Sequence, residues 1–166
     1  MGMIEVLISI TISAFALLGL AGLQVAALRY QKVANFRSLA SQYGSDMGDR
    51  IRANAAGANA GNYVTSGQYA AAYASTTPTC AVSTACTPAE IAAMDIDAWR
   101  VGLSKALAGG WGSVSGNTTN GFVVTVYFNE PDKTLAGTKD AGCSTSAFPS
   151  GVDQNAIRCF LTVVTP

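Results

Sequence analysis

The acidic residue Glu5 stands alone in an apolar run that extends from Ile4 to Leu28. A carboxylate within hydrocarbon costs at least about 2.5–3.5 kcal/mol, so such a group normally has a charged partner. No Lys or Arg lies near Glu5 in the sequence, because the first of them is Arg29. Two interpretations follow. Glu5 pairs with a charge from outside its own stretch of sequence, or it is protonated near a membrane interface and has no specific role.

Four cysteines are the second group of chemically reactive side chains: Cys80, Cys86, Cys143 and Cys159. They show no CxxC spacing and the chain has no histidine, so a zinc site or a redox-active motif is disfavoured. Cysteines of this kind suit disulfides formed in an oxidising compartment. Four cysteines allow three connectivities. Of these we expect the local one, Cys80–Cys86 and Cys143–Cys159.

The sequence shows no catalytic constellation, and we do not expect an enzyme, a metal site or a cofactor. The absence of histidine excludes Ser-His-Asp and Cys-His catalysis and the HExxH site. Asp95 and Asp97 lie two positions apart on a predicted helix and therefore point apart, so we interpret them as a solvated face or as cap partners. Trp99 and Trp111 are expected in the core. Four further charges are expected on exposed loops: Asp132, Lys133, Lys139 and Asp140.

The composition of the 166-residue chain indicates a protein that is partly lipid-exposed or buried in an assembly. Ten Lys and Arg balance ten Asp and Glu, charged residues make up 12%, hydrophobic residues 49%, and the mean hydropathy is +0.29. A neutral chain does not favour a protein that grips phosphate backbones. After Arg52 only five cations remain, so strong nucleic-acid binding is not expected; they are Arg100, Lys105, Lys133, Lys139 and Arg158.

The apolar excess lies in residues 1–28, which we expect to cross a membrane. About 20 apolar residues span a hydrocarbon core of about 30 Å. Basic residues follow at once, at Arg29, Lys32 and Arg37, and the positive-inside rule would place them in the cytoplasm. The cysteines beyond them indicate the opposite side of the membrane. The two indications agree if a positively charged leader once preceded Met1 and has been removed.

The helical pattern continues beyond the apolar run, so one helix is expected from about Gly2 to Ala53. Its second half, residues 29–53, carries an apolar stripe with steps of three and four: Val33, Phe36, Leu39, Ala40, Tyr43, Met47 and Ile51. This half must therefore lie against a globular domain. Gly19 and Gly22 are weak points in the first half. They are either a hinge, where the helix bends or melts, or positions for close helix packing.

Residues 54–166 form the expected globular head. Residues 54–110 read as a loop with a helix over about 88–107, because Thr87, Pro88 and Glu90 make a capping box. The side chains expected to face inward from this helix are Ile91, Met94, Ala98, Leu103 and Leu107. In residues 111–166, β-rich runs at 121–129 and 156–164 predict strands, and 111–115 is a candidate third. The fold class is α+β: a long N-terminal helix on a small antiparallel sheet.

The first ten residues, MGMIEVLISI, resemble the start of mature type IV pilins and of the related secretion pseudopilins. In those proteins an acidic residue stands at position five of a helical apolar run, as Glu5 does here. Longer stretches resemble minor pilins of the PilV type: residues 17–24 (LLGLAGLQ), 38–42 (SLASQ), 46–54 (DMGDRIRAN) and 95–99 (DIDAW). The resemblance covers residues 1–54 and, more loosely, 80–110. It implies the pilin fold, with the helix packed on the sheet of the head.

The resemblance also implies a function. Met1 would be the N-methylated first residue, and Glu5 would pair with the N-terminal amine of a neighbouring subunit within a filament. The implied partners are other pilins, a leader peptidase and an inner-membrane assembly platform. The protein would cross the bacterial inner membrane once, with its head in the periplasm, and then enter an extracellular pilus.

Three roles remain open within this resemblance. The leading one is a minor pilin of the initiation or tip complex that primes assembly. The second is a pseudopilin of a type II secretion system. The third is a main pilus subunit with an adhesive or DNA-uptake role, which would need a basic or aromatic patch on the head.

Overall fold

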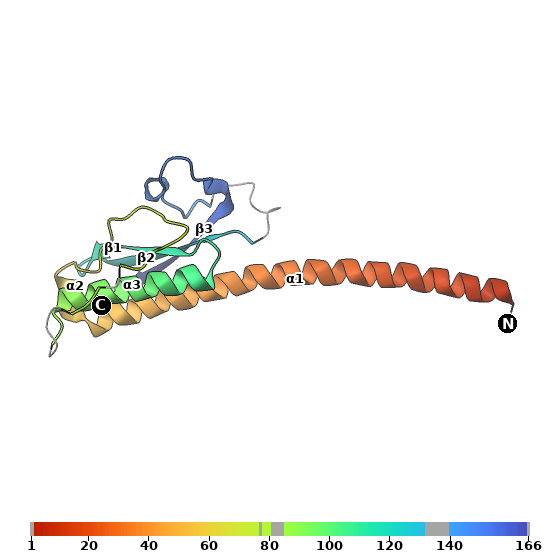
Figure 1. Cartoon of the computed structure of the whole chain (residues 1–166), viewed down its shortest axis with the longest axis horizontal. Helices are drawn as coiled ribbons and strands as arrows, with labels where there is room; N and C mark the ends of the chain where they lie inside the picture. The colour runs from red at the N-terminus through yellow and green to blue at the C-terminus, as the bar shows by residue number, and fades with distance from the viewer. Residues whose placement is uncertain (1, 77, 81–84, 132–139, 166) are drawn as a thin grey trace.

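The computed structural model describes residues 2–76, 78–80, 85–131 and 140–165, apart from the side chain of Thr145. One long helix runs the length of the molecule, and a small head covers only its C-terminal half (Figure 1). The head consists of a second long helix, a three-stranded sheet and the loops that join them. This arrangement confirms the predicted α+β fold of a long helix on a small antiparallel sheet.

Helix α1 spans Met3–Ala53 without interruption. Helix-forming residues and the absence of proline before Pro78 account for its length. The predicted apolar stripe is confirmed, because each of its members is buried or half-buried against the head: Val33, Phe36, Leu39, Ala40, Tyr43, Met47 and Ile51. A short helix, α2, follows at Ala55–Asn59 after the cap residue Asn54, whose side chain accepts from the Gly57 amide.

Helix α3 spans Pro88–Ala106 and begins with the predicted capping box. The Thr87 hydroxyl accepts from the Glu90 amide at 3.2 Å, and the Glu90 carboxylate accepts from the Thr87 amide at 2.7 Å. The predicted inner face was wrong for Ile91, Met94 and Ala98, which are exposed. The buried stripe of α3 contains Ala92, Ile96, Trp99 and Leu103. At 100° per residue, the three exposed positions lie roughly 110–170° around the helix from the centre of this stripe.

The sheet has the strand order β1-β2-β3, with β1 at Trp111–Asn117, β2 at Gly121–Asn129 and β3 at Ile157–Val164. Both pairings are antiparallel; Val114 faces Val124, and Val124 faces Thr162. All three predicted strands are therefore confirmed. Two 3-10 turns lie between β2 and β3, at Thr145–Ala147 and Gln154–Ala156.

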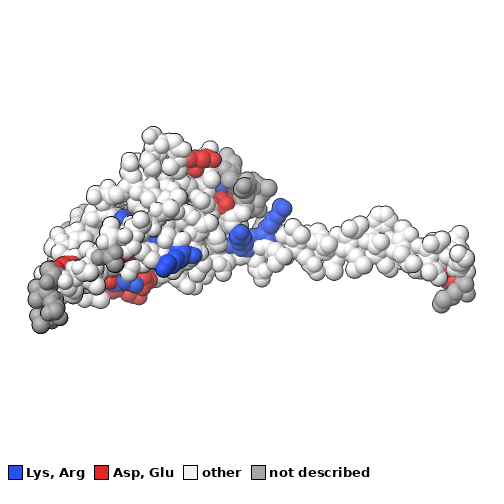
Figure 2. All heavy atoms as spheres, viewed as in Figure 1, with Lys and Arg blue, Asp and Glu red and all other residues white. Residues whose placement is uncertain are grey.

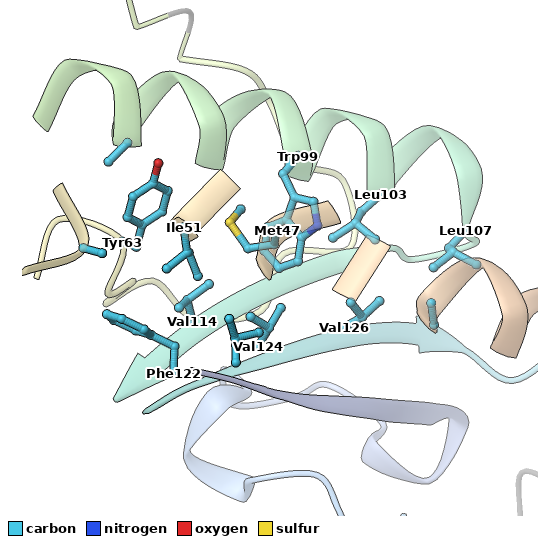
Figure 3. Packing of buried hydrophobic residues seen from close by; sticks show 14 of the residues in the cluster. Met47, Ile51, Tyr63, Trp99, Leu103, Leu107, Val114, Phe122, Val124 and Val126 are labelled. Carbon is cyan, nitrogen blue, oxygen red and sulfur yellow. The ribbon is translucent and has the colours of Figure 1, made fainter. Parts of the chain in front are cut away.

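The main core lies between α1, α3 and one face of the sheet (Figure 3). Trp99 descends from α3 beside Met47 of α1, and Val114, Val124 and Val126 rise from the sheet below them. The Trp99 indole donates a 2.8 Å hydrogen bond to the carbonyl of Tyr43, so its polar group is satisfied as well as buried. A second cluster on the other face of the sheet includes Tyr69, Trp111, Tyr127 and Phe148. The core positions predicted for Trp99 and Trp111 are thus confirmed.

Two glycines let α1 approach the sheet closely. A methyl group added at Gly44 would lie 2.6 Å from Thr162 Oγ1, and one at Gly48 would lie 2.9 Å from Val164 Cγ2. Four residues of helix and two residues of strand both advance by about 6 Å. The two glycines therefore face alternate residues of β3, and α1 and β3 run alongside each other.

Candidate assembly surface

The first half of α1 is bare. Every described residue from Gly2 to Lys32 is exposed. The helix contains a stretch that is long and apolar enough to cross a membrane, with a mean hydropathy of 2.3 and none of its residues buried. Large apolar side chains stand out all around it: Met3, Ile4, Val6, Leu7, Ile8, Ile10, Ile12, Phe15, Leu17, Leu18, Leu20, Leu23, Val25 and Leu28. An apolar surface of this extent is unstable in water and calls for lipid or protein cover.

Three hydroxyl side chains within this half are satisfied by the helix itself. The hydroxyls of Ser9, Thr11 and Ser13 donate to the carbonyls four residues earlier, at 2.7–2.8 Å. Such bonds allow hydroxyl side chains to lie in lipid or against another helix without an unmet donor. From Met3 to Leu28 the bare half is therefore an almost continuous apolar rod whose one charged residue is Glu5.

Glu5 is the exception on this rod. It lies in the first turn of α1, its amide donates to the Gly2 carbonyl at 3.0 Å, and its side chain is exposed. Within the described residues, no group forms a hydrogen bond or ion pair with its carboxylate. Met1, which carries the amine expected to pair with Glu5 in a neighbouring subunit, lies outside the described residues. An acidic group in the first turn is favourable to the helix dipole.

Gly19 and Gly22 lie within α1 without interrupting it. Within the described residues, a methyl group at either position would meet no atom within 4 Å, so neither glycine is needed for close packing there. The hinge and the packing positions expected at these glycines stay predictions.

The second half of α1 is fixed to the head by Asp95 of α3. The Asp95 carboxylate accepts from Arg50 Nη1 at 3.1 Å and from the Tyr63 hydroxyl at 2.6 Å. Arg50 also bonds Asp46 on α1, at 3.0 Å. Burial raises the pKa of Tyr63 to about 12, and its hydrogen bond to Asp95 acts in the same direction. Asp95 thus joins α1, α3 and the chain after α2, and its interpretation as part of a solvated face was wrong.

Asp97 anchors the uncharged loop that wraps the head. Its carboxylate is buried and accepts from the Tyr73 hydroxyl at 2.8 Å, the Ser75 hydroxyl at 2.7 Å and the Thr76 amide at 2.9 Å. Burial raises the pKa of Asp97, but the hydrogen bonds from Ser75, Thr76 and Tyr73 outweigh it and leave the pKa below its ordinary value. The solvated interpretation was wrong here too. The two aspartates do point apart, as their spacing predicted, and each binds a different segment.

Two arginines of the head are held within it. The Arg100 guanidinium lies 4.7 Å from the centre of the Trp111 ring and 5.7 Å from that of Tyr73, and its Nε donates to the Gly112 carbonyl at 3.0 Å. Burial lowers the pKa of Arg100. Arg158 pairs with the buried Glu130 at 3.0 Å. Neither group is free to bind an external phosphate, whereas Lys105 is exposed.

The cysteines are joined locally, Cys80 to Cys86 and Cys143 to Cys159. The second disulfide ties β3 to the loop before it. Asp140 lies on this loop, as expected, but is half-buried rather than exposed; it accepts from the Gly142 amide at 3.1 Å and from the Cys159 amide at 3.3 Å. Asp132, Lys133 and Lys139 lie outside the described residues. Within the described part of the chain, no three His, Cys, Asp or Glu side chains gather as a metal site would require.

Sequence reasoning missed Asp95 and Asp97 as positioning residues. One signal was present: the segment from Asn54 to Thr76 has tyrosines and hydroxyl residues but no charge of its own. A long uncharged loop on a small head needs anchors in the elements that it crosses. A carboxylate on a neighbouring helix can accept several hydrogen bonds at once, and Asp95 and Asp97 were two candidates for such an anchor.

Comparison with known proteins gave one match. The family model described as type IV pilin Tt1218 (Tt1218-like) matches residues 22–97. The matched region begins in the apolar half of α1 and ends at Asp97 in α3. No curated protein and no solved structure gives a significant match. The family match and the observed architecture both support a place in the type IV pilin superfamily.

Proposed function

From its place in the type IV pilin superfamily, we propose that this chain is a minor pilin of the complex that initiates a type IV pilus or forms its tip. Members of this superfamily are structural proteins that pack against other pilins, and the family match supports that coarser role directly. The minor role rests on the resemblance of residues 17–24, 38–42, 46–54 and 95–99 to minor pilins of the PilV type.

The observation that carries the proposal is the division of α1 into two halves. The half from residue 33 onward has its apolar stripe covered by the head, and the half before it has no cover at all. Lipid can cover the bare half while the protein resides in a membrane, and the same half of other subunits can cover it in a filament. Assembly then exchanges one apolar environment for another, so little hydrophobic free energy is lost on leaving the membrane.

Glu5 would fix how neighbouring helices align when the subunit enters the filament. In the proposed filament its carboxylate pairs with the N-terminal amine of Met1 in a neighbouring subunit. Each charge alone destabilises an apolar environment, whereas the two together offset part of that cost. Pairing therefore favours one axial register between helices that otherwise offer each other only apolar side chains.

The test replaces Glu5 with leucine in the full chain. Glu5→Leu should leave the protein in the membrane fraction and reduce its recovery in sheared pili by at least tenfold, because removal of one partner from a buried pair costs about 3–5 kcal/mol. Thr11→Leu is the matched control, since it adds an apolar side chain to the same rod and removes no charge. Equal recovery of Glu5→Leu and wild-type protein would reject the pairing.

Gly19 and Gly22 form the second part of the proposed assembly mechanism. Each glycine lowers helix stability by about 1 kcal/mol relative to alanine, and no contact with the described residues offsets that loss. We propose that α1 locally loses helical structure here when a subunit enters the filament. Close packing of neighbouring helices at the two glycines is the alternative role.

The remaining proposals concern place and partners. Before assembly, α1 crosses the bacterial inner membrane once with the head in the periplasm. A leader peptidase exposes Met1, which is then N-methylated, and an inner-membrane assembly platform delivers the subunit to an extracellular pilus. A type II secretion pseudopilin would use the same helix in a periplasmic filament, so detection of the protein in sheared surface fibres distinguishes the two.

A further inference from the structure

We propose that Arg29, Tyr30, Lys32 and Arg37 form a lipid-binding belt that takes the phosphate groups of anionic phospholipids and fixes the depth of α1 in the membrane. The inference rests on the proposed membrane-bound state of the subunit and goes beyond its role in the pilus. The four residues are hereafter called the basic belt.

The three cations of the basic belt are unused within the chain. Arg29, Lys32 and Arg37 are exposed, and among the described residues none of them forms a hydrogen bond or ion pair. The four salt bridges of the described chain are made by Arg50, Arg52 and Arg158 instead. Three free cations within nine positions of a helix need counter-charges from outside the molecule.

The position of the basic belt selects phospholipid as the source of those charges. The apolar rod ends at Leu28, and the belt begins at the next residue. Figure 2 shows Lys and Arg atoms gathered on α1 where the bare helix meets the head, at the level where a membrane surface must lie if the rod is in hydrocarbon. Tyr30 is 71% exposed there, and tyrosine is enriched at that level because its ring is apolar and its hydroxyl is polar.

The basic belt also lies on the side of the membrane that the positive-inside rule disfavours for cations. Cations beside a span normally stay in the cytoplasm, yet the disulfide-bonded head requires the oxidising side. The belt therefore does not set the orientation of the helix. Attraction to lipid phosphates at the surface beside it is a role that these cations can fill on either side.

The position of the basic belt along the helix also determines the depth of Glu5 in the membrane. Glu5 and Arg29 lie twenty-four positions apart on one unbroken helix, which is about 36 Å along the axis. The hydrocarbon core is about 30 Å thick. When the belt lies at the phosphates on the head side, Glu5 lies at the opposite boundary of the hydrocarbon. Its carboxylate then stays hydrated until assembly draws it into a filament.

The other charges near the basic belt leave it a net positive surface. Arg37 lines a surface cleft that also contains Asp140 and Arg158. Arg158 is paired with Glu130, and Asp140 accepts from two backbone amides. The acidic groups of α1 closest in sequence, Asp46 and Asp49, are paired with Arg50 and Arg52. Within the described residues, no acidic side chain forms an ion pair with the belt. Asp140 keeps its charge in the cleft beside Arg37, and the three cations of the belt still outnumber it.

The test measures lipid binding by the full chain in detergent micelles. Native mass spectrometry counts the lipids retained from an equal mixture of phosphatidylglycerol and phosphatidylcholine. Each cation at an anionic surface changes binding by about fivefold, so Arg29→Gln/Lys32→Gln/Arg37→Gln should lower the preference for phosphatidylglycerol by up to about a hundredfold. Lys105→Gln removes an exposed cation of the head and should change nothing. Arg29→Lys/Arg37→Lys retains the charges and should retain the preference.

Two results would overturn the lipid assignment. One is a wild-type chain with no preference for phosphatidylglycerol. The other is a triple glutamine variant that keeps the preference. If that variant also loses pilus incorporation, the belt serves an acidic surface of another subunit instead of lipid. A melting temperature of the head equal to that of wild type would show that the triple variant is correctly folded. The lipid-binding measurements do not depend on assembly, so a failure of the proposed pilus function is distinguishable from a failure of the lipid assignment.

The depth is tested separately, in phosphatidylglycerol vesicles. A nitroxide on Ser9→Cys, the sole free thiol among the described residues, reports depth through its collisions with oxygen and with a water-soluble nickel chelate. The triple glutamine variant should shift this depth by about one helical turn, roughly 5 Å. Equal depths in the two proteins would show that the belt does not fix the position of α1.

Discussion

The two halves of α1 belong to one helix and yet depend on different surroundings. From Met3 to Lys32 the helix is exposed throughout, whereas Ala40, Met47 and Ile51 in the other half are fully buried. The second half is stabilised by the head of its own chain, whereas the first half needs lipid or other subunits to cover its apolar surface. Substitutions in the second half should therefore change the stability of the monomer, and substitutions in the first half should change only what the monomer joins.

The largest effect on stability is expected at Trp99, the bulkiest side chain between α1 and α3. Trp99→Ala leaves a cavity and removes the hydrogen bond from the indole to the Tyr43 carbonyl, and should lower the free energy of unfolding of the head by about 3–5 kcal/mol. Denaturant unfolding of the full chain in detergent, followed by near-ultraviolet circular dichroism, measures this. Leu18→Ala removes a large apolar side chain from the bare half and should leave the transition unchanged. A similar loss in both variants would contradict the division of α1.

A second comparison uses glycines alone. Gly44→Ala forces a methyl group against Thr162 and should destabilise the head by about 1–3 kcal/mol. Gly19→Ala and Gly22→Ala meet open space, so thermal unfolding of the head should be as in wild type. If the hinge proposal holds, the same two variants reduce recovery in sheared pili, because alanine stabilises the helix where it must open. Unaltered melting of Gly44→Ala would mean that α1 and β3 are not in close contact.

The third effect is expected for Asp97, and it depends on pH. Because its pKa is lower in the folded state than in the unfolded chain, the stabilisation is complete above the unfolded value of about 4 and is lost as the pH falls through the folded value. Asp97→Asn should cost about 1–3 kcal/mol at pH 7 and flatten the loss of stability below about pH 4. Denaturant unfolding between pH 2 and pH 7 measures both.

The control for this prediction lies in the bare half. Glu5→Gln removes a carboxylate that touches nothing in the head. The pH dependence of the free energy of unfolding of the head should therefore be the same as in wild type. An Asp97→Asn variant with the same acid dependence as wild type would show that Asp97 does not hold the loop.

The sequence predicted the elements whose signals are local. The apolar run, the stripe from Val33 to Ile51, the capping box at Thr87 and the three strands all depend on spacing within a short segment, and the structure confirms them. Glu5 was also selected as a candidate assembly residue from local sequence, because it is the only charge in the apolar run. Its pairing with Met1 concerns a second molecule and stays a prediction.

Long-range features could not be predicted in the same way. The inner face of α3 was misjudged because Ile91 and Met94 are strongly apolar, yet Met94 lies beside the Cys80 sulfur rather than in the core, at 3.9 Å. The partners of Asp97 come from a loop without periodicity, so no pattern connects them to α3. The roles of Gly44 and Gly48 depend on β3, more than a hundred residues later in the chain.

The side-by-side course of α1 and β3 has a mechanical consequence. The contacts of Gly44 with Thr162 and of Gly48 with Val164, and the 3.3 Å bond from Arg52 to the Thr165 carbonyl, follow one another along the same direction. A pull along the axis of α1 loads all of them together in shear, so they must yield at once rather than one after another. Tension on the helix is thereby passed to the sheet, and through the Cys143–Cys159 bond to the loop outside it.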